Sequence, residues 1–315
     1  MRSQIQKRFA DWEREAFRTF RKGDLKKSRE MSEEIAGLFP EKRYKTDMWR
    51  ISIHARTGEK EAAFRLAFQA LHDGIWWHPE RLREEPELDP LKSDARFDLL
   101  VEACYNLMKQ ESDRHLPMLY SMGDTQSRKR MFAIHWRGDN ASAFSEYWEE
   151  TALLSDWHVG FPQSSQVFGY ERFCWDDEQR ARADLSESKR HFDEISMSNS
   201  DQTVLCGASQ GGKLAIDSAL GWKPFRESRF FAVVPSIRDL KPYEAILREG
   251  ICRDTRGYIL TGEYDPYIDQ AAAFHKLLTD YDVPCKLKIV NGIGHEFPED
   301  FETYLLEAAE FLTGE

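Results

Sequence analysis

The sequence predicts two fold classes in series. Residues 1–112 are expected to form an all-α helical-repeat domain, and residues 113–315 an α/β domain whose mostly parallel sheet has helices on both faces. Helical spacing of apolar residues in the first part and alternating strand and helix patterns in the second carry this prediction. The length of 315 residues, with 41% hydrophobic and 31% charged residues, is ample for buried cores in one large or two ordinary domains.

The overall charge and hydropathy exclude several classes of partner. The net charge of −11 disfavours binding to nucleic acid or to anionic lipid headgroups. No apolar stretch approaches the ~20 residues that cross a bilayer, and the first eight residues lack the apolar core of a secretory signal. We therefore expect a cytoplasmic protein without an integral membrane segment.

The cysteines give no sign of a disulfide framework or a zinc site. They are odd in number, widely scattered and never in a C-x-x-C pair. We expect no bound metal, and we expect them to pack as small apolar residues: Cys104, Cys174, Cys206, Cys252 and Cys285.

The first third contains two helical pairs with similar spacing. Residues 4–38 have apolar positions at helical intervals with a break at Gly23-Asp24, and a second pair over residues 44–55 and 60–71 breaks at Gly58-Glu59. The two breaks are about 35 residues apart, a period typical of tetratricopeptide-like arrays. We therefore predict a tetratricopeptide-like helical region.

Residues 72–112 are expected to complete this region. Trp76 and Trp77 precede an acidic, proline-containing loop over residues 84–91, and a closing helix is predicted over residues 94–109. Such a region could serve as a structural cap or lid. We favour this role; the alternative is that the region binds a protein partner or mediates self-association.

From about residue 116 the pattern changes to short apolar runs separated by helices. The first two strands, residues 116–122 and 130–135, are expected to pair as a hairpin, and residues 161–175 to form an irregular aromatic loop. Asp176 and Asp177 are expected to cap the helix that follows. Further strands are predicted over residues 157–162, 204–206, 230–235, 257–261 and 285–290, and further helices over residues 141–154, 178–196, 270–280 and 299–312.

One turn has the features of a nucleophile elbow. The segment Gly207–Gly212, with sequence GASQGG, lies between a buried strand and the helical run 213–220. In such a turn the serine, here Ser209, adopts a strained backbone conformation that exposes its hydroxyl, and strand and helix approach too closely for side chains at Gly207 and Gly211. Cys206 ends the strand and is expected to pack in the core.

Two further residues follow strand ends in the order that a Ser-Asp-His triad requires in such a sheet. Asp265 comes after the strand at 257–261, and His295 comes after the last strand, in a glycine-flanked turn. We predict that Ser209, Asp265 and His295 form a triad. Glu263 and Asp269 stay open as alternatives to Asp265.

The oxyanion of an acyl-transfer reaction would need two N–H donors. The first is expected from Gln210, the residue after the nucleophile, and the second from the loop at 135–140. Arg137 is the preferred second donor and Trp136 the alternative. His135 is expected to fix the geometry of this loop without transferring protons.

These motifs together resemble the alpha/beta-hydrolase superfamily, in particular its phospholipase/carboxylesterase branch with the acyl-protein thioesterases. Gly207–Gly212 resembles the G-F-S-Q-G-G of that branch, Asp265-Pro266 its acid loop, Gly292–His295 its G-M-G-H, and His135–Asp139 its H-G-L-G-D. The sequence departs from the pattern at Trp136, where the family has glycine. The resemblance covers roughly the last 200 residues and excludes the helical third.

The resemblance implies a serine hydrolase of the carboxylesterase or thioesterase type that cleaves a small-molecule ester or thioester of a small or medium acyl group. Ser209 would be the nucleophile, His295 the base and Asp265 the residue that orients it, with no cofactor. The alternative is a protein-binding adaptor that uses the helical repeats, with the hydrolase domain as a scaffold.

Overall fold

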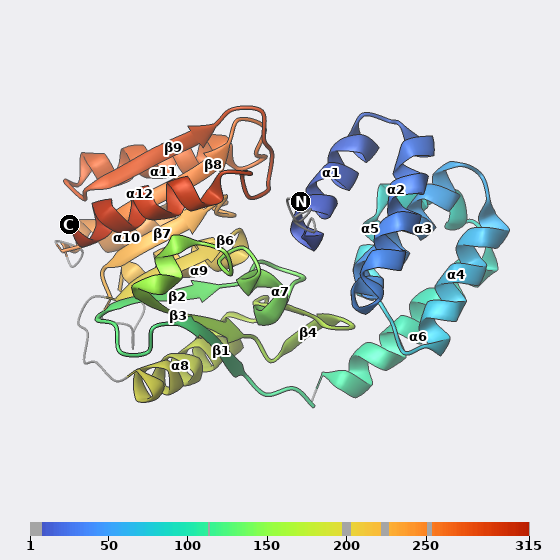
Figure 1. The fold of residues 1–315 in the computed structure, drawn as a ribbon, viewed down its shortest axis with the longest axis horizontal. Coiled ribbons are helices and arrows are strands. Elements are labelled where there is room, and N and C mark those ends of the chain that lie inside the picture. Colours follow the sequence, from blue (N-terminus) through green and yellow to red (C-terminus); the bar gives the residue numbers. More distant parts are fainter. Residues whose placement is uncertain (1–7, 113, 197–202, 222–226, 251–253, 315) are drawn as a thin grey trace, which may run out of the picture. The chain divides into compact units, whose positions relative to one another are not determined.

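The computed structural model describes residues 8–112, 114–196, 203–221, 227–250 and 254–314, which group into two compact units (Figure 1). The helical unit comprises residues 1–115 together with residues 167–172, and the sheet unit comprises residues 116–166 and 173–315. The sequence analysis divided the chain after residue 112; residue 113 lies outside the described residues. No sequence pattern indicated that residues 167–172 group with the helices.

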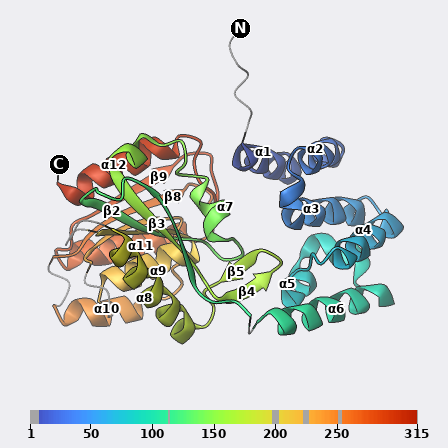
Figure 2. The ribbon, with the colours of Figure 1, turned by 60° about the horizontal axis from the view of Figure 1, so that its bottom comes forward.

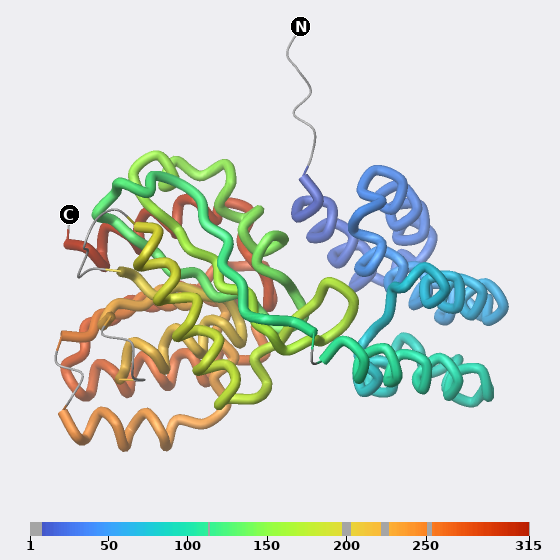
Figure 3. Tube along the Cα trace, turned by 90° about the horizontal axis from the view of Figure 1, so that it is seen from below, coloured from blue at the N-terminus to red at the C-terminus, as the bar shows by residue number. Residues whose placement is uncertain are grey.

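The helical unit is built from successive helices joined by tight turns. Gly23, Gly58 and Gly74 end three of these helices with φ near +80°, a conformation that glycine adopts without a steric penalty. Neighbours in the sequence pack on one another, α1 on α2, α2 on α3 and α3 on α4, which Figure 3 lets the reader follow along the chain. The elements are α1 Phe9–Arg21, α2 Leu25–Leu38, η1 Pro40–Lys42, α3 Arg43–Arg56, α4 Lys60–His72, α5 Pro79–Glu84, η2 Pro86–Leu91 and α6 Ala95–Glu111.

Four of these helices match the predicted helical pairs, and α6 matches the predicted closing helix. The short helix η2 occupies most of the segment 84–91 that was expected to be a loop, and α5 lies just before it, where no element was predicted. Trp76 and Trp77 are buried in the core of the unit, and the Trp77 indole donates a hydrogen bond to the carbonyl of Tyr44, 3.1 Å away. The assignment of these helices to a tetratricopeptide-type repeat stays a prediction.

Residues 167–172, the central part of a short hairpin, complete the helical unit. Strands β4 (Gln166–Gly169) and β5 (Arg172–Cys174) pair with each other in the segment predicted to be an irregular aromatic loop. Gly169 forms a β-bridge with Trp77, and the Tyr170 amide donates to the carbonyl of Trp76. These backbone contacts explain why residues 167–172 group with the helices.

The sheet unit contains a seven-stranded, mostly parallel sheet in the order β1-β3-β2-β6-β7-β8-β9. Its central strand β6 is buried along its whole length, as expected for a strand covered on both faces. The strands are β1 Met118–Gly123, β2 Lys129–Ile134, β3 Trp157–Gln163, β6 Thr203–Ala208, β7 Arg229–Val233, β8 Arg256–Gly262 and β9 Cys285–Val290.

Helices cover both faces of this sheet. In Figure 2, α8, α9, α10 and α11 lie on one face, and α7 and α12 lie on the other. Each face has its own apolar core, one including Phe192, Ile216 and Phe274 and the other including Phe144, Trp148 and Phe301. The elements are α7 Ala141–Ser145, η3 Ala152–Ser155, α8 Glu178–Ile195, α9 Gln210–Ala219, α10 Lys241–Arg248, α11 Ile268–Asp280 and α12 Phe301–Thr313.

Two predictions for this unit are wrong in detail. Strands β1 and β2 do not form a hairpin, because β3 lies between them and pairs antiparallel with β1 and parallel with β2. The turn after β1 is fixed to the start of β3 by the Asp124 amide, which donates to the Trp157 carbonyl. The helix expected over residues 141–154 is the short α7, followed by turns and η3. Strand and helix otherwise alternate as predicted, so the sheet unit has the expected α/β architecture of a mostly parallel sheet with helices on both faces.

Candidate functional site

Ser209 occupies a sharp turn between β6 and α9. Its backbone has φ 52° and ψ −114°, a region that is costly for a residue with a side chain. The surrounding chain maintains this conformation: the Ser209 amide donates to the Val233 carbonyl, 2.9 Å away, and the Ser209 carbonyl accepts from the Ser236 amide at 3.1 Å. The strained residue is thereby held from strand β7 and the loop that follows it.

The two glycines of the turn lie where backbone segments approach closely. A β-carbon on Gly207 would overlap the backbone of Gly211 and Gly212. A β-carbon on Gly211 would overlap the carbonyl oxygens of Ile134 and His135, at the end of β2. Any side chain at either position would force α9 away from the sheet and displace Ser209.

Asp265 and His295 meet beyond the ends of β8 and β9. The His295 Nδ1 atom lies 2.9 Å from Asp265 Oδ2, and the His295 Nε2 atom lies 2.7 Å from the Ser209 Oγ. The Asp265 carboxylate is completely buried and also accepts from the Tyr267 amide at 2.7 Å. With the carboxylate as an acceptor, Nδ1 carries the proton, and Nε2 accepts a hydrogen bond from the serine hydroxyl.

The alternatives to Asp265 have other partners. Glu263 accepts from the Gly292 amide at 2.9 Å, and so holds the turn that precedes His295. Asp269 lies in the first turn of α11, where a carboxylate interacts favourably with the helix dipole. Among the carboxylates of the described residues, Asp265 is the one within hydrogen-bonding distance of His295.

The loop after β2 is organised by a buried imidazole. His135 is fully buried, and burial lowers its pKa to about 4, so the ring is neutral at physiological pH. Its Nδ1 donates to the carbonyl of Trp136 at 2.8 Å, and its own carbonyl accepts from the Trp175 indole at 3.0 Å. This geometry fits a role in fixing the loop rather than in proton transfer.

The Trp136 side chain is held at both its polar and apolar ends. Its indole N–H donates to Asp139 at 2.7 Å, and its ring packs edge-on against Phe144, Tyr147 and Phe297. The bulky residue therefore belongs to an aromatic cluster of the sheet unit.

Asp176, which was predicted to cap the following helix, instead connects the loop after β2 to the turn that holds Ser209. Asp177 caps α8 as predicted, by accepting from the Arg180 amide, but Asp176 does not. Instead Asp176 accepts from the Arg137 guanidinium at 2.7 Å and from the Gln210 side-chain amide at 2.9 Å. Desolvation acts to raise the pKa of Asp176, yet these two hydrogen bonds keep it below its usual value.

The side chain of Gln210 is bonded on both its polar atoms, because its carbonyl oxygen also accepts from the Trp175 amide at 2.9 Å. Gln210 is the first residue of α9, where backbone N–H groups have no acceptor within the helix. The predicted oxyanion donors Gln210, Arg137 and Trp136 therefore lie on segments joined through Asp176 and Trp175. No signal in the sequence indicated the Asp176 bridge, which depends on contacts between residues far apart in the chain.

Metal sites and membrane spans were sought in the same described residues. No group of three or more His, Cys, Asp or Glu side chains is arranged to bind a metal ion there, and the described cysteines are unpaired. Cys252 lies outside them. None of the helices in the described ranges combines the length and apolar character needed to span a bilayer.

No protein-family model matches the sequence, and no curated protein matches it. Solved structures do resemble it. An uncharacterised protein from Bacillus cereus is similar at 21% identity and a TM-score of 0.55, over 96% of this chain and 98% of that one. Esterase PE8 is similar at 18% identity and a TM-score of 0.48, over 64% of this chain and 98% of that one. A phospholipase/carboxylesterase from Dyadobacter fermentans is similar at 16% identity and a TM-score of 0.46, over 62% of this chain and 97% of that one. What this chain shares with the Bacillus cereus protein is a fold that extends over both units.

Proposed function

We propose that this protein is a serine hydrolase of the carboxylesterase or thioesterase type. The observation that supports this most strongly is the continuous hydrogen-bonded series from Asp265 through His295 to Ser209, with Ser209 on a strained strand-to-helix turn. A serine hydroxyl becomes a competent nucleophile when an adjacent base removes its proton, and a buried carboxylate orients that base. The three side chains come from three different strand ends, so their agreement in geometry is not a local accident.

The mechanism that follows has two acyl-transfer steps. The Ser209 Oγ attacks the ester or thioester carbonyl while His295 Nε2 takes its proton, which gives a tetrahedral oxyanion. Collapse of this intermediate breaks the bond to the leaving group, which receives the proton from His295 and departs as an alcohol or thiol. Water, deprotonated by His295, then hydrolyses the acyl-enzyme and releases the carboxylic acid. Asp265 keeps Nδ1 protonated throughout.

The oxyanion would be stabilised by backbone N–H groups. Gln210 supplies one at the start of α9, and the loop after β2 supplies the other, from Arg137 or Trp136. One such donor contributes about 3–4 kcal/mol to the transition state. The Asp176 bridge between Arg137 and Gln210 supports this proposal, because it holds the two donor segments together before substrate binds.

A series of p-nitrophenyl esters of increasing acyl length tests the proposal. Wild type should hydrolyse the short or medium esters, and the Ser209→Ala variant should lose this activity and labelling by a fluorophosphonate. The dependence of the hydrolysis rate on acyl length would show how long an acyl group the site accepts. A folded wild-type protein that neither hydrolyses any ester nor reacts with the fluorophosphonate would overturn it.

A further inference from the structure

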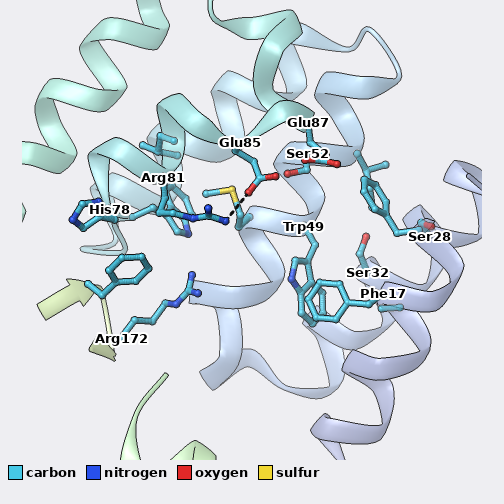
Figure 4. A pocket seen from close by; sticks show the side chains of 17 residues that line it. Phe17, Ser28, Ser32, Trp49, Ser52, His78, Arg81, Glu85, Glu87 and Arg172 are labelled. Atoms are coloured by element: carbon cyan, nitrogen blue, oxygen red, sulfur yellow. Dashed lines mark hydrogen bonds and ion pairs between the residues drawn. The ribbon is translucent and has the colours of Figure 1, made fainter. Parts of the chain in front are cut away.

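The helical unit contains a cavity of about 370 Å³, which we call the helical-unit cavity (Figure 4). Residues of α1, α2, α3, α5 and η2 line it, together with Phe168 and Arg172 of the β4–β5 hairpin, and all of them belong to this unit. Its volume lies at the lower end of the range of ~300–1,000 Å³ found for small-molecule sites. This volume suits a ligand of the size of an amino acid or a dipeptide rather than a long peptide.

Aromatic side chains form much of the wall. Phe17, Phe20, Trp49, Trp77 and Phe168 all line the cavity, and Phe17 and Trp49 meet edge to face with centroids 5.4 Å apart. Such faces accept apolar side chains, and their negative electrostatic potential also attracts an ammonium group.

The charged groups of the cavity are segregated by sign. Glu85 and Glu87 lie on the side of Ser52, whereas Arg172 lies on the side of His78, with Arg81 between the two groups (Figure 4). Arg81 contacts Glu85 at 3.4 Å, and the Arg172 guanidinium lies 5.8 Å from the centre of the Phe168 ring. The cavity thus carries two carboxylates towards one end and the Arg172 guanidinium towards the other, with the Arg81 guanidinium between them in contact with Glu85.

We propose that the helical-unit cavity binds a zwitterion of amino-acid or dipeptide size with an apolar side chain. Its ammonium group would be held by Glu87 and Glu85, its carboxylate by Arg172 and Arg81, and its side chain by the aromatic wall. A ligand with a single charge would meet repulsion from one of the two charged groups, whereas a zwitterion complements both. Guanidinium groups also match carboxylate geometry with paired N–H donors.

The protonation of the acidic end agrees with this assignment. Desolvation first, and then the hydrogen bond and charge of Glu87, raise the pKa of Glu85 to about 7, while Arg81 and Lys92 oppose the shift. Two further charged groups face these glutamates. The Arg56 guanidinium of α3 contacts Glu87 at 3.9 Å, and Arg172 lies across the cavity on the β4–β5 hairpin. Glu85 is therefore partly protonated near neutral pH, whereas the pKa of Glu87 is lowered, and the ammonium group of a ligand would displace the proton from Glu85.

Calorimetric titration of the full-length chain with the dipeptide leucyl-phenylalanine tests the proposal. Its N-acetyl form lacks the ammonium charge and its C-terminal amide lacks the carboxylate. The free dipeptide should bind, and each blocked form should bind about tenfold more weakly or worse. Titration near pH 7 in two buffers of different ionisation enthalpy should show proton release on binding of the free dipeptide.

Two variants assign the ends of the ligand. Glu87→Gln should weaken the free dipeptide about tenfold and leave the N-acetyl form unchanged, whereas Arg172→Gln should weaken the free dipeptide and leave the amide unchanged. Glu80→Gln serves as a control, because Glu80 is an exposed carboxylate of α5 that does not line the cavity. Circular dichroism checks that each variant is folded, and Glu85→Gln provides a second test of the acidic end. Absence of binding at millimolar dipeptide, equal binding of the blocked forms, or wild-type binding by both variants would overturn the proposal.

Discussion

The serine site of the sheet unit and the helical-unit cavity both combine acidic and basic groups, but they hold them differently. In the sheet unit, Asp265, His295 and Ser209 are joined by hydrogen bonds of 2.9 and 2.7 Å, and the carboxylate is completely buried. In the helical-unit cavity the ion pairs of Glu85 and Glu87 are long, at 3.4 and 3.9 Å. Short internal bonds fix a geometry for chemistry, whereas loosely paired charges leave capacity for a ligand.

The largest effect should come from removing the proposed nucleophile. Ser209→Ala should lower kcat for ester hydrolysis about 10⁴-fold or more, because the remaining binding and oxyanion groups cannot replace the covalent route. Ser186→Ala, at a half-buried serine on α8 whose hydroxyl donates to the Arg182 carbonyl, is the matched control and should keep wild-type rates. Stopped-assay or spectrophotometric hydrolysis of a short p-nitrophenyl ester measures both. Retained hydrolysis in the Ser209 variant would mean that the short hydrogen bonds of this site serve only the fold.

Substitution of Asp265, Asp269 and Glu263 in turn tests which of these acidic residues orients His295. Asp265→Asn should lower kcat about 10³- to 10⁴-fold, since an amide donates a hydrogen bond to Nδ1 and favours the wrong tautomer of His295. Asp269→Asn should leave kcat within about threefold of wild type, because the loss there is one favourable helix-dipole contact. Glu263→Gln retains an acceptor for the Gly292 amide and should behave like Asp269→Asn. A larger loss at Asp269 than at Asp265 would reassign the acid.

The Asp176 bridge tests whether preorganisation around the serine extends beyond the triad. Asp176→Asn weakens the charge-assisted bonds to Arg137 and Gln210, so kcat should fall about tenfold with little change in KM. Asp177→Asn alters the adjacent helix cap and should leave kcat unchanged, with at most about 1 kcal/mol lost in unfolding free energy. Steady-state kinetics and urea unfolding distinguish the two. Equal kinetics for both variants would limit the organised site to Ser209, His295 and Asp265.

The positions of Ser209, Asp265 and His295 were predictable because strand ends are local features and all parallel strands deliver their ends to one edge of a sheet. The pairing of β1 with β3 was not predictable, because it depends on which distant strand lies beside β1. The short separation of β1 and β2 in the sequence instead favoured a hairpin between those two strands. Strand β5 is only three residues long and carries no alternating pattern. The Asp176 bridge depends on three segments that meet only after folding, so a carboxylate before a helix looked like a cap.

The smallest effect should be the change in stability caused by the ionisation of Glu85 in the helical-unit cavity. In the folded protein burial raises the pKa of Glu85 from 4.5 to about 7, so ionisation costs stability there that it does not cost in the unfolded chain. The contribution of Glu85 to the stability of wild type should therefore fall as the pH rises from about 4.5 to above 7. The uncharged Glu85→Gln variant avoids this cost, and should be more stable than wild type by about 1 kcal/mol at pH 8, after allowance for solvent screening of a partly exposed group.

Below pH 4.5 wild type and the Glu85→Gln variant should unfold alike, because Glu85 is protonated in both the folded and the unfolded chain. Glu84→Gln, a largely exposed neighbour, should show no such dependence on pH. Urea unfolding at pH 4, 6 and 8 measures all three proteins. A variant that is less stable than wild type at pH 8 would show that the Arg81 ion pair outweighs the cost of burial. The charged side chains of the cavity would then stabilise one another, as those of the serine site do, and would not favour binding of a charged ligand.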